Sequence, residues 1–270
     1  IVDRLVGSEM CIRDRAGIVD YRQVCARMAE KVESKEENQI FLASKVVQMS
    51  MSGDRVVVST ARGEHEARFV VNCAGLHSDR VTSLTETPKA KIIPFRGEYF
   101  EVIPEAHHLC RNLIYPVPDP SFPFLGVHFT RMIGGGLECG PNAVLAFARE
   151  GYTRTNVNWK DLAETLSYPG FLRLSAKYWR TGLGEMWRSF SKGAFVRALQ
   201  RLVPEIEEHH LEAVPAGIRA QAVTPEGKLV DDFLIQESSR VIHVGNAPSP
   251  AATSSLNIGR LIVEKLEAHF

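Results

Sequence analysis

The sequence predicts a mixed α/β protein in which one α/β domain is interrupted by an antiparallel sheet with its own helices. Residues 16–88 and 212–270 alternate short apolar strands with stretches of helical periodicity, which is typical of α/β units. Residues 89–211 instead carry clustered prolines between short β-rich runs, followed by a helical stretch. We therefore expect a split domain formed by the two outer segments and an inserted domain formed by residues 89–211.

Composition and charge exclude several classes of protein. The chain has 270 residues with 32 Lys and Arg against 32 Asp and Glu, so no net field favours nucleic acid. Its 5 cysteines form neither a CxxC pair nor a zinc spacing, which indicates reduced thiols and no metal site. No apolar run approaches the roughly 20 residues of a membrane span. We expect a cytoplasmic protein, at most peripheral to a membrane, without a nucleic-acid partner.

The first stretch of the chain, IVDRLVGSEMCIRDR, differs in pattern from the other 255 residues, 16–270. Residues 1–15 have neither the layout of a signal peptide nor a clear helical or strand period. They resemble a translated sequencing adapter. We expect this stretch to be a leader that is not native, and ordered structure to begin near Ala16.

The first α/β segment opens with a helix and continues with strands. Asp20 is a candidate N-cap with Gln23 as its capping-box partner, and six apolar residues over the next turns share one helix face. The runs at 40–51 and 55–60 predict two strands joined by a Ser-Gly-Asp turn. A later strand breaks at residues 74–75, where the Ala-Gly pair precedes a new helix.

The helical part of the inserted segment contains a run of mixed aromatic and basic residues, FLRLSAKYWRTGLGEMWRSFSK, at positions 171–192. Such a run is typical either of a helix that packs on its own sheet or of one that rests in a membrane interface. We favour packing on the sheet, because Gly182 and Gly184 should end the helix early.

The end of the chain has the pattern strand, small residues, helix. An apolar strand at 241–246 runs into prolines, alanines and serines, and a helix begins at Ser255. Amide N–H groups at such a helix start carry partial positive charge and suit an anion or an electron-rich carbonyl. The alternative is an ordinary turn with nothing bound.

Several motifs together resemble one enzyme family. They are VVNCAGLHSDRV, PFRGEYF, LIYPVPDPSFPFLGVHFTRM, GPNAVLAFAREGY, GIRAQAV, GKLVDDF and NAPSPAATSSLNIGR. In this order, from about Ala16 to the C-terminus, they resemble the L-2-hydroxyglutarate oxidase/dehydrogenase family of D-amino-acid-oxidase-like FAD-dependent oxidoreductases. The resemblance implies a three-layer FAD-binding domain with an inserted substrate domain. It also implies oxidation of L-2-hydroxyglutarate, a small dicarboxylate, to 2-oxoglutarate by hydride transfer to flavin N5, with electrons passed to quinone or oxygen.

One element of that family has no counterpart in this sequence. The family opens with a βαβ unit whose G-x-G-x-x-G turn holds the FAD pyrophosphate. The only glycine run, GGG at residues 134–136, falls in the segment predicted as antiparallel. The resemblance therefore implies an N-terminally truncated fragment that binds FAD weakly or not at all and is inactive alone. Alternatives are an oxidase of another 2-hydroxy acid or of an amine, and a non-catalytic remnant with an anion-binding pocket.

The resemblance also implies roles for individual residues at the cofactor. Val46 would meet the adenine, while Ala74 and Gly75 would lie on the adenosine-diphosphate side. The turn from Gly245 to Ser254 would face the pyrimidine end of the flavin. Its implied cofactor-binding residues are Asn246, Pro248, Ser249, Ala251, Thr253 and Ser254. Arg96 either faces the flavin or pairs with Glu98, and the two options are equally favoured.

On the substrate side the resemblance implies three residues. Arg219 occupies the place where related oxidases bind the substrate α-carboxylate, and a guanidinium can do so through two hydrogen bonds. His128 is the preferred base for the hydroxyl proton, since imidazole titrates at about pH 6.5. Tyr115 is a second candidate, as a hydroxyl donor. The alternatives are a surface arginine, a hydrogen-bonded core histidine and an ordinary strand tyrosine.

Overall fold

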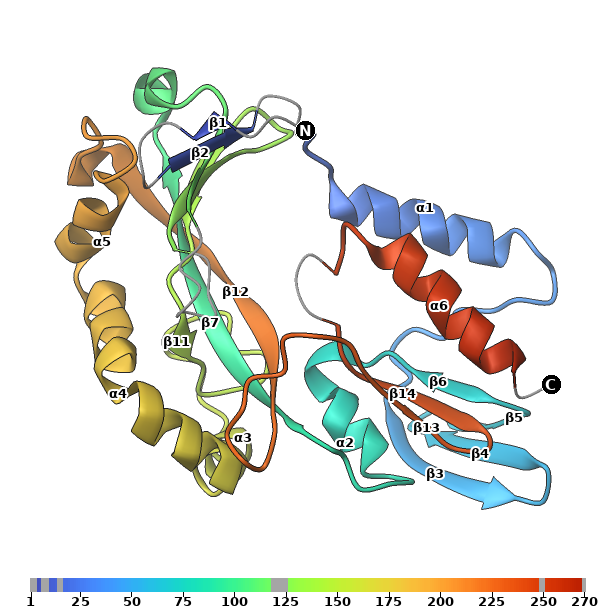
Figure 1. Cartoon of the computed structure of the whole chain (residues 1–270). Coiled ribbons are helices and arrows are strands. Elements are labelled where there is room, and N and C mark those ends of the chain that lie inside the picture. The colour runs from blue at the N-terminus through green and yellow to red at the C-terminus, as the bar shows by residue number, and fades with distance from the viewer. Residues whose placement is uncertain (1–3, 6–9, 14–16, 118–125, 248–250, 269–270) are drawn as a thin grey trace. The chain divides into compact units, whose positions relative to one another are not determined.

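A computed structural model describes residues 4–5, 10–13, 17–117, 126–247 and 251–268. The chain forms two compact units, shown in Figure 1. Unit 1 comprises residues 1–19 and 93–219, and unit 2 comprises residues 20–92 and 220–270. The mixed α/β class with antiparallel sheets, predicted from the sequence, is confirmed.

Unit 2 contains two sheets of three strands each. The first is antiparallel and contains, in order, β3 (Val46–Ser52), β4 (Arg55–Thr60) and β5 (Gly63–Ala67). The second contains, in order, β13 (Leu234–Glu237), β14 (Val241–Asn246) and β6 (Val70–Asn72). Strand β14 is antiparallel to β13 and parallel to β6, so this second sheet has the α/β character that the sequence predicted.

The helices of unit 2 begin close to the predicted positions. They are α1 (Tyr21–Glu33), the 3₁₀ helix η1 (Gly75–His77), α2 (Ser78–Thr82) and α6 (Ser255–Glu267). The Asp20 carboxylate accepts hydrogen bonds from the amides of Arg22 (2.9 Å) and Gln23 (3.2 Å), which confirms the predicted N-cap. None of the residues of α1 is buried, so its predicted apolar face does not join the core of the described chain.

Unit 1 is built on a long antiparallel sheet. Its strands are, in order, β1 (Arg4–Leu5), β2 (Met10–Arg13), β8 (Leu113–Pro116), β9 (His128–Arg131), β10 (Leu137–Gly140), β7 (Lys91–Val102) and β11 (Val144–Leu145), and β12 (Leu211–Val223) pairs with β7. Strand β2 pairs with β8, with Cys11 opposite Tyr115. The expectation that ordered structure begins near Ala16 is therefore wrong for β1 and β2, since the edge of β8 offers β2 a partner. The origin of residues 1–15 stays a prediction.

The core of unit 1 lies between this sheet and its helices. The helices are η2 (Pro104–Leu109), α3 (Trp159–Leu166), α4 (Pro169–Phe190), α5 (Lys192–Leu199) and η3 (Glu208–His210). Phe100, Phe129 and Cys139 come from three neighbouring strands and pack with Phe195 and Leu199 of α5. This face of the sheet is therefore the core-forming face, and α4 and α5 lie on its side in Figure 1.

Helix α4 continues past the two glycines that were expected to end it. Gly182 and Gly184 lie inside the helix, and the non-helical backbone is at Tyr178 (φ −114°, ψ 21°). The last turns are anchored by two buried polar residues, because Glu185 accepts from the Ala143 amide (3.3 Å) and the Ser189 hydroxyl bonds to the Glu98 carboxylate (2.8 Å). These contacts offset the low helix propensity of glycine, about 1 kcal/mol per residue.

Candidate functional site

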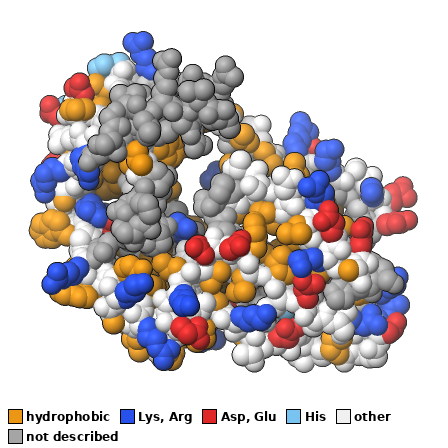
Figure 2. Space-filling view, viewed as in Figure 1, with side chains coloured by type: hydrophobic (Ala, Val, Ile, Leu, Met, Phe, Trp, Pro, Cys, Tyr) orange, Lys and Arg blue, Asp and Glu red, His pale blue; other side chains and the backbone are white. Residues whose placement is uncertain are grey.

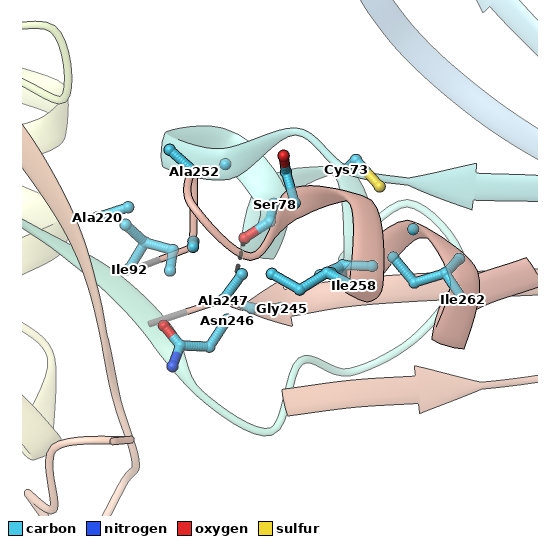
Figure 3. A pocket seen from close by; sticks show the side chains of 15 residues that line it. Cys73, Ser78, Ile92, Ala220, Gly245, Asn246, Ala247, Ala252, Ile258 and Ile262 are labelled. Carbon is cyan, nitrogen blue, oxygen red and sulfur yellow. Dashed lines mark hydrogen bonds between the residues drawn. The ribbon is translucent and has the colours of Figure 1, made fainter. Parts of the chain in front are cut away.

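A pocket lies in unit 2 at one edge of its parallel strand pair. Strands β6 and β14 run side by side, with Val70 opposite Val241 and Asn72 opposite His243. Their carboxyl ends meet at the same edge, where open α/β sheets bind ligands. Helix η1 comes after the first strand and α6 after the second, and between them is a cavity of about 430 Å³, shown in Figure 3.

The pocket is lined mainly by small and apolar residues. Gly245 contributes from β14, Ala247 and Ala252 from the segment that follows it, and Ile258 and Gly259 from α6. A Cβ added to Gly259 would meet no atom within 4 Å, and the same holds for Gly75, whose φ of +52° favours glycine. A side chain at either position would therefore enter open space at the pocket. The surface suits a flat ligand that approaches the backbone closely.

The start of α6 adds a polar feature to this apolar surface. Ser254 is the N-cap, and its side chain makes no capping hydrogen bond in the described chain. The amides of the first helical turn carry the positive end of the helix dipole. Ser255, the first residue of α6, lines the pocket, so the apolar surface lies beside a helix start of the kind that binds electron-rich oxygens.

Hydrogen bonds fix the rim of the pocket. The Ser78 hydroxyl donates to the Gly245 carbonyl (3.2 Å), which ties α2 to β14. The Asn246 side-chain amide donates to the carbonyls of Val230 (3.1 Å) and Asp232 (2.8 Å). Asn246 therefore holds the backbone beside the pocket through its side chain, while it also lines the cavity.

Three of the predicted cofactor-binding residues line the pocket: Gly75, Asn246 and Ala251. Thr253 bonds to the Tyr21 hydroxyl (3.1 Å), and Ser254 is the N-cap of α6. Pro248 and Ser249 lie outside the described residues.

Two other predicted positions lie elsewhere in unit 2. Val46 is the first residue of β3, in the separate antiparallel sheet. Ala74 precedes η1, and its amide donates to the Asn72 side-chain oxygen (3.1 Å). Sequence reasoning missed Cys73, Ser78, Ile92 and Ala220, which also line the pocket.

Arg96 belongs to unit 1 and is 5% exposed, and its guanidinium donates to the Glu98 carboxylate (3.2 Å) and the Thr153 carbonyl (3.3 Å). The structure thus shows the ion pair that was one of the two options for Arg96. Glu98 also accepts from Arg154 (2.8 Å) and Ser189 (2.8 Å). Burial alone would raise the pKa of Glu98, but these hydrogen bonds and the charge of Arg154 hold the pKa below its usual value.

His128 and Tyr115 form a stacked pair on unit 1. Ile114 of β8 pairs with Phe129 of β9, so the antiparallel ladder brings Tyr115 opposite His128. Their ring centroids are 4.4 Å apart with an interplanar angle of 25°. His128 Nδ1 lies 3.0 Å from the Gly126 carbonyl, which can only accept, so Nδ1 carries the proton and Nε2 the lone pair. Burial lowers the pKa of His128, which keeps Nε2 able to accept a proton at neutral pH.

Tyr99 extends this pair into a row, although sequence reasoning missed it. Gly140 pairs with His128 on β9, and a Cβ at Gly140 would lie 3.1 Å from the Tyr99 ring. Burial, with the charge of a nearby carboxylate and the neighbouring Tyr115, raises the pKa of Tyr99, so its hydroxyl stays protonated. A Cβ at Gly217 of β12 would lie 3.5 Å from the same ring. Tyr99, Tyr115 and His128 therefore share one face of the sheet, which we call the aromatic face.

Arg219 lies on β12 two residues after Gly217, so strand alternation places it on the aromatic face as well. Its side chain is exposed, and partial burial lowers the pKa of the guanidinium without removing its charge. The structure therefore brings the three predicted substrate-side residues, His128, Tyr115 and Arg219, to the same face of one sheet.

Two kinds of feature are absent from the described part of the chain. Its residues include no cluster of three His, Cys, Asp or Glu side chains that could hold a metal ion. None of its helices is both long and apolar enough to cross a membrane.

Comparison with known proteins finds relatives that share one name. The chain is 53% identical over 252 residues to L-2-hydroxyglutarate dehydrogenase of Indibacter alkaliphilus, a match that covers 93% of this chain and 63% of the relative. It is 46% identical over 254 residues to the protein of that name from Escherichia coli K12, covering 93% of this chain and 60% of the relative. The chain thus spans less than two thirds of the length of these relatives.

The fold also resembles a solved structure, an L-alpha-glycerophosphate oxidase from Mycoplasma pneumoniae with FAD bound. The TM-score is 0.58 at 17% identity, covering 83% of this chain and 50% of that one. The family model described as FAD dependent oxidoreductase (DAO) matches residues 6–265. With nearly its whole length matched, the chain belongs to the family of FAD-dependent oxidoreductases.

Proposed function

We propose that this chain supplies cofactor- and substrate-binding residues for the oxidation of L-2-hydroxyglutarate to 2-oxoglutarate. The observation that carries the proposal is the 53% identity to a protein named L-2-hydroxyglutarate dehydrogenase, over a stretch that covers 93% of the chain. The two groups of candidate residues lie in different units. The proposal assigns a different task to each group.

Unit 2 would hold FAD, and its pocket fits the group. The positions of Gly75 and Gly259 leave space that any side chain would fill, and the first turn of α6 offers amides to an electron-rich oxygen. When bound, FAD supplies the two-electron oxidant for the C2–H bond and passes the electrons to quinone or oxygen. The residues named would bind and orient the cofactor and keep bulk water from its apolar surface.

The aromatic face of unit 1 would bind the substrate and take its proton. His128 Nε2 accepts the proton of the C2 hydroxyl, and the hydroxyls of Tyr99 and Tyr115 donate hydrogen bonds to the substrate oxygens. The Arg219 guanidinium binds one carboxylate of the dicarboxylate. The low pKa of His128 keeps the imidazole neutral and ready to accept at neutral pH.

An activity assay tests the proposal. The chain is purified with added FAD, and in parallel residues 17–268 replace the matching part of the E. coli relative in a chimera. Reduction of an artificial dye is followed with L-2-hydroxyglutarate, its D isomer, other 2-hydroxy acids and amines. In the chimera we expect activity with the L isomer and a loss of about 100-fold in kcat for His128→Gln. His209→Gln, at a side chain that is 66% exposed, is the matched control. Equal rates for His128→Gln and the control would contradict the role of His128, and a preference for another substrate would contradict the substrate.

We also propose a peripheral contact with the inner face of a membrane, made by α4. Five large apolar residues of α4 recur at the spacing of one helix face and are 42–71% exposed. They are Trp179, Leu183, Met186, Trp187 and Phe190. We call them the α4 stripe.

In the last turns of α4 the polarity is the reverse of that of an ordinary surface helix, whereas its first half buries the apolar Leu174. Its buried positions include Glu185 and Ser189, while the apolar stripe faces outward. Glu185 is its only acidic residue and is paired with Arg188, whereas Arg173, Lys177 and Arg180 are exposed. In Figure 2, hydrophobic and basic side chains lie side by side over the region where Figure 1 draws α4. Apolar and aromatic residues flanked by cations suit the interface of an anionic bilayer.

Co-sedimentation with vesicles tests this contact. We expect the chain to bind phosphatidylglycerol vesicles more tightly than phosphatidylcholine vesicles, and Trp187→Ser with Phe190→Ser to weaken binding by about tenfold or more. Leu42→Ser, at a residue of unit 2 that is 76% exposed, is the matched control. The proposal would be contradicted if the double variant bound vesicles as tightly as Leu42→Ser. It would also be contradicted if the chain self-associated through the α4 stripe and did not bind vesicles.

A further inference from the structure

We propose that His243 is a positioning residue of the unit 2 pocket, held as a neutral imidazole with its proton on Nε2. We further propose that it orients Asn72 and, through Asn72, the connection at residues 73–78, which holds η1 and the first residue of α2 and which we call the loop. The expected effect on FAD affinity rests on the proposed function. The protonation state of His243 and its effect on the loop are independent of the proposed function.

The hydrogen bonds around Asn72 define the tautomer of His243. The Ala74 amide donates to Asn72 Oδ1 (3.1 Å), which fixes the orientation of the side-chain amide. Asn72 Nδ2 then faces His243 Nδ1 at 3.1 Å. An amide nitrogen can only donate, so Nδ1 accepts and the proton resides on Nε2. Nε2 in turn lies 3.0 Å from the Thr85 hydroxyl, which accepts from it.

From Asn72 the hydrogen bonds continue to the pocket. Asn72 Nδ2 also lies within donor distance of the Ser78 carbonyl (3.0 Å) and the Thr82 hydroxyl (3.3 Å). The Ser78 hydroxyl donates to the Gly245 carbonyl (3.2 Å), and Ser78 and Gly245 both line the pocket. The bonds therefore lead from β14 through β6 and α2 back to β14. The His243 side chain lines no part of the cavity, although its neighbours Val244 and Gly245 in β14 do, and the path through Asn72 links that side chain to Gly75 and Ser78 across the pocket.

The surroundings of His243 favour the neutral form. Its side chain is fully buried, and burial lowers the pKa of the imidazole. The Glu86 carboxylate, whose Oε1 lies 4.0 Å from Nε2, opposes this effect. A second proton on Nδ1 would face the N–H groups of Asn72, so protonation would break the bond that orients the loop.

The first arm of the test reads the tautomer directly. Histidine-selective ¹⁵N labelling with long-range ¹H–¹⁵N correlation distinguishes a protonated Nε2 from a protonated Nδ1. At pH 7 we expect His243 to show a protonated Nε2 and an unprotonated Nδ1. In Asn72→Asp, where a carboxylate oxygen replaces the donor, we expect Nδ1 to become protonated. A protonated Nδ1 in the unmodified chain would overturn the proposal.

The second arm reads the loop and the pocket. His243→Asn keeps an acceptor for Asn72, whereas His243→Leu removes it at similar size. We expect amide hydrogen exchange at Gly75 and Ser78 to rise about tenfold or more in His243→Leu and much less in His243→Asn. The Kd for FAD, from titration of flavin fluorescence, should change in the same order.

The outcomes of the two arms separate this proposal from the proposed function. Equal exchange rates in the two His243 variants would show a purely structural role and overturn the proposal. If exchange shows the expected order but FAD binds neither the chain nor the chimera, the cofactor assignment fails and the positioning of the loop stands.

Discussion

Replacing Gly259 by Ala should raise the stability of the fold and weaken FAD binding at the same time. Gly259 lies inside α6, where Gly to Ala gains about 0.5–1 kcal/mol of helix propensity. The new Cβ would meet no atom within 4 Å, so no clash offsets this gain. For a chain of this size the melting temperature should rise by about 2 °C.

Gly259 lines the pocket, so we expect the same methyl group to lie at the pocket surface. An added methyl in a close-fitting site costs about 1–3 kcal/mol, which corresponds to a Kd for FAD raised roughly 5- to 150-fold. Thermal unfolding monitored by circular dichroism and a flavin fluorescence titration measure the two effects. Gly182→Ala in α4 is the matched control, because that glycine is also helical, has open space around its Cβ position and lines no part of the pocket.

Opposite signs for stability and affinity are the distinguishing feature of this prediction. A general disturbance of the fold would lower both, and a position remote from FAD would change stability alone. If Gly259→Ala gains stability with an unchanged Kd, the flat ligand does not lie against α6, and the reasoning about the pocket is refuted.

Three further predictions concern capping, a buried ion pair and the pH dependence of stability. Asp20→Ala should lose about 1 kcal/mol, measured by urea unfolding, because α1 loses both capping bonds; no change would mean that the cap is unimportant. Glu98→Gln should lose about 3–5 kcal/mol in the same measurement, since it leaves the buried Arg96 without its counterion; a smaller loss than for Asp20→Ala would contradict this. The folded pKa of His243 lies below the unfolded value of about 6.5, so its contribution to stability is present above that pH and is lost as the pH falls through the folded value. The difference between the urea midpoints at pH 7.5 and pH 5 should therefore be larger for the unmodified chain than for His243→Asn. An equal difference in the two proteins would contradict this prediction.

Local patterns were sufficient to predict the elements that depend on neighbouring residues. The N-cap at Asp20 needs only the amides two and three residues away, and the structure has both bonds. The turn after β14 and the start of α6 at Ser255 were predicted from a run of small residues between an apolar strand and a helical period. Each of these features is set within a few residues of sequence.

Features that depend on distant residues were missed. Ile92 and Ala220 line the pocket from two strands far apart in the sequence. Tyr99 joins His128 only through the register of three strands, with glycine at position 140 between them. The continuation of α4 through Gly182 depends on tertiary anchors, which overrode its helix propensity. Sequence periodicity carries no information about such pairings.

The most direct test of FAD binding by unit 2 is a titration of the ¹⁵N-labelled chain with FAD, monitored by ¹H–¹⁵N correlation spectra, which also detect weak binding. We expect saturable shifts of the amides of Gly75, Gly245 and Gly259, which line the pocket of unit 2. FAD that shifts residues elsewhere in the described chain and leaves these three glycines unchanged would contradict the central claim.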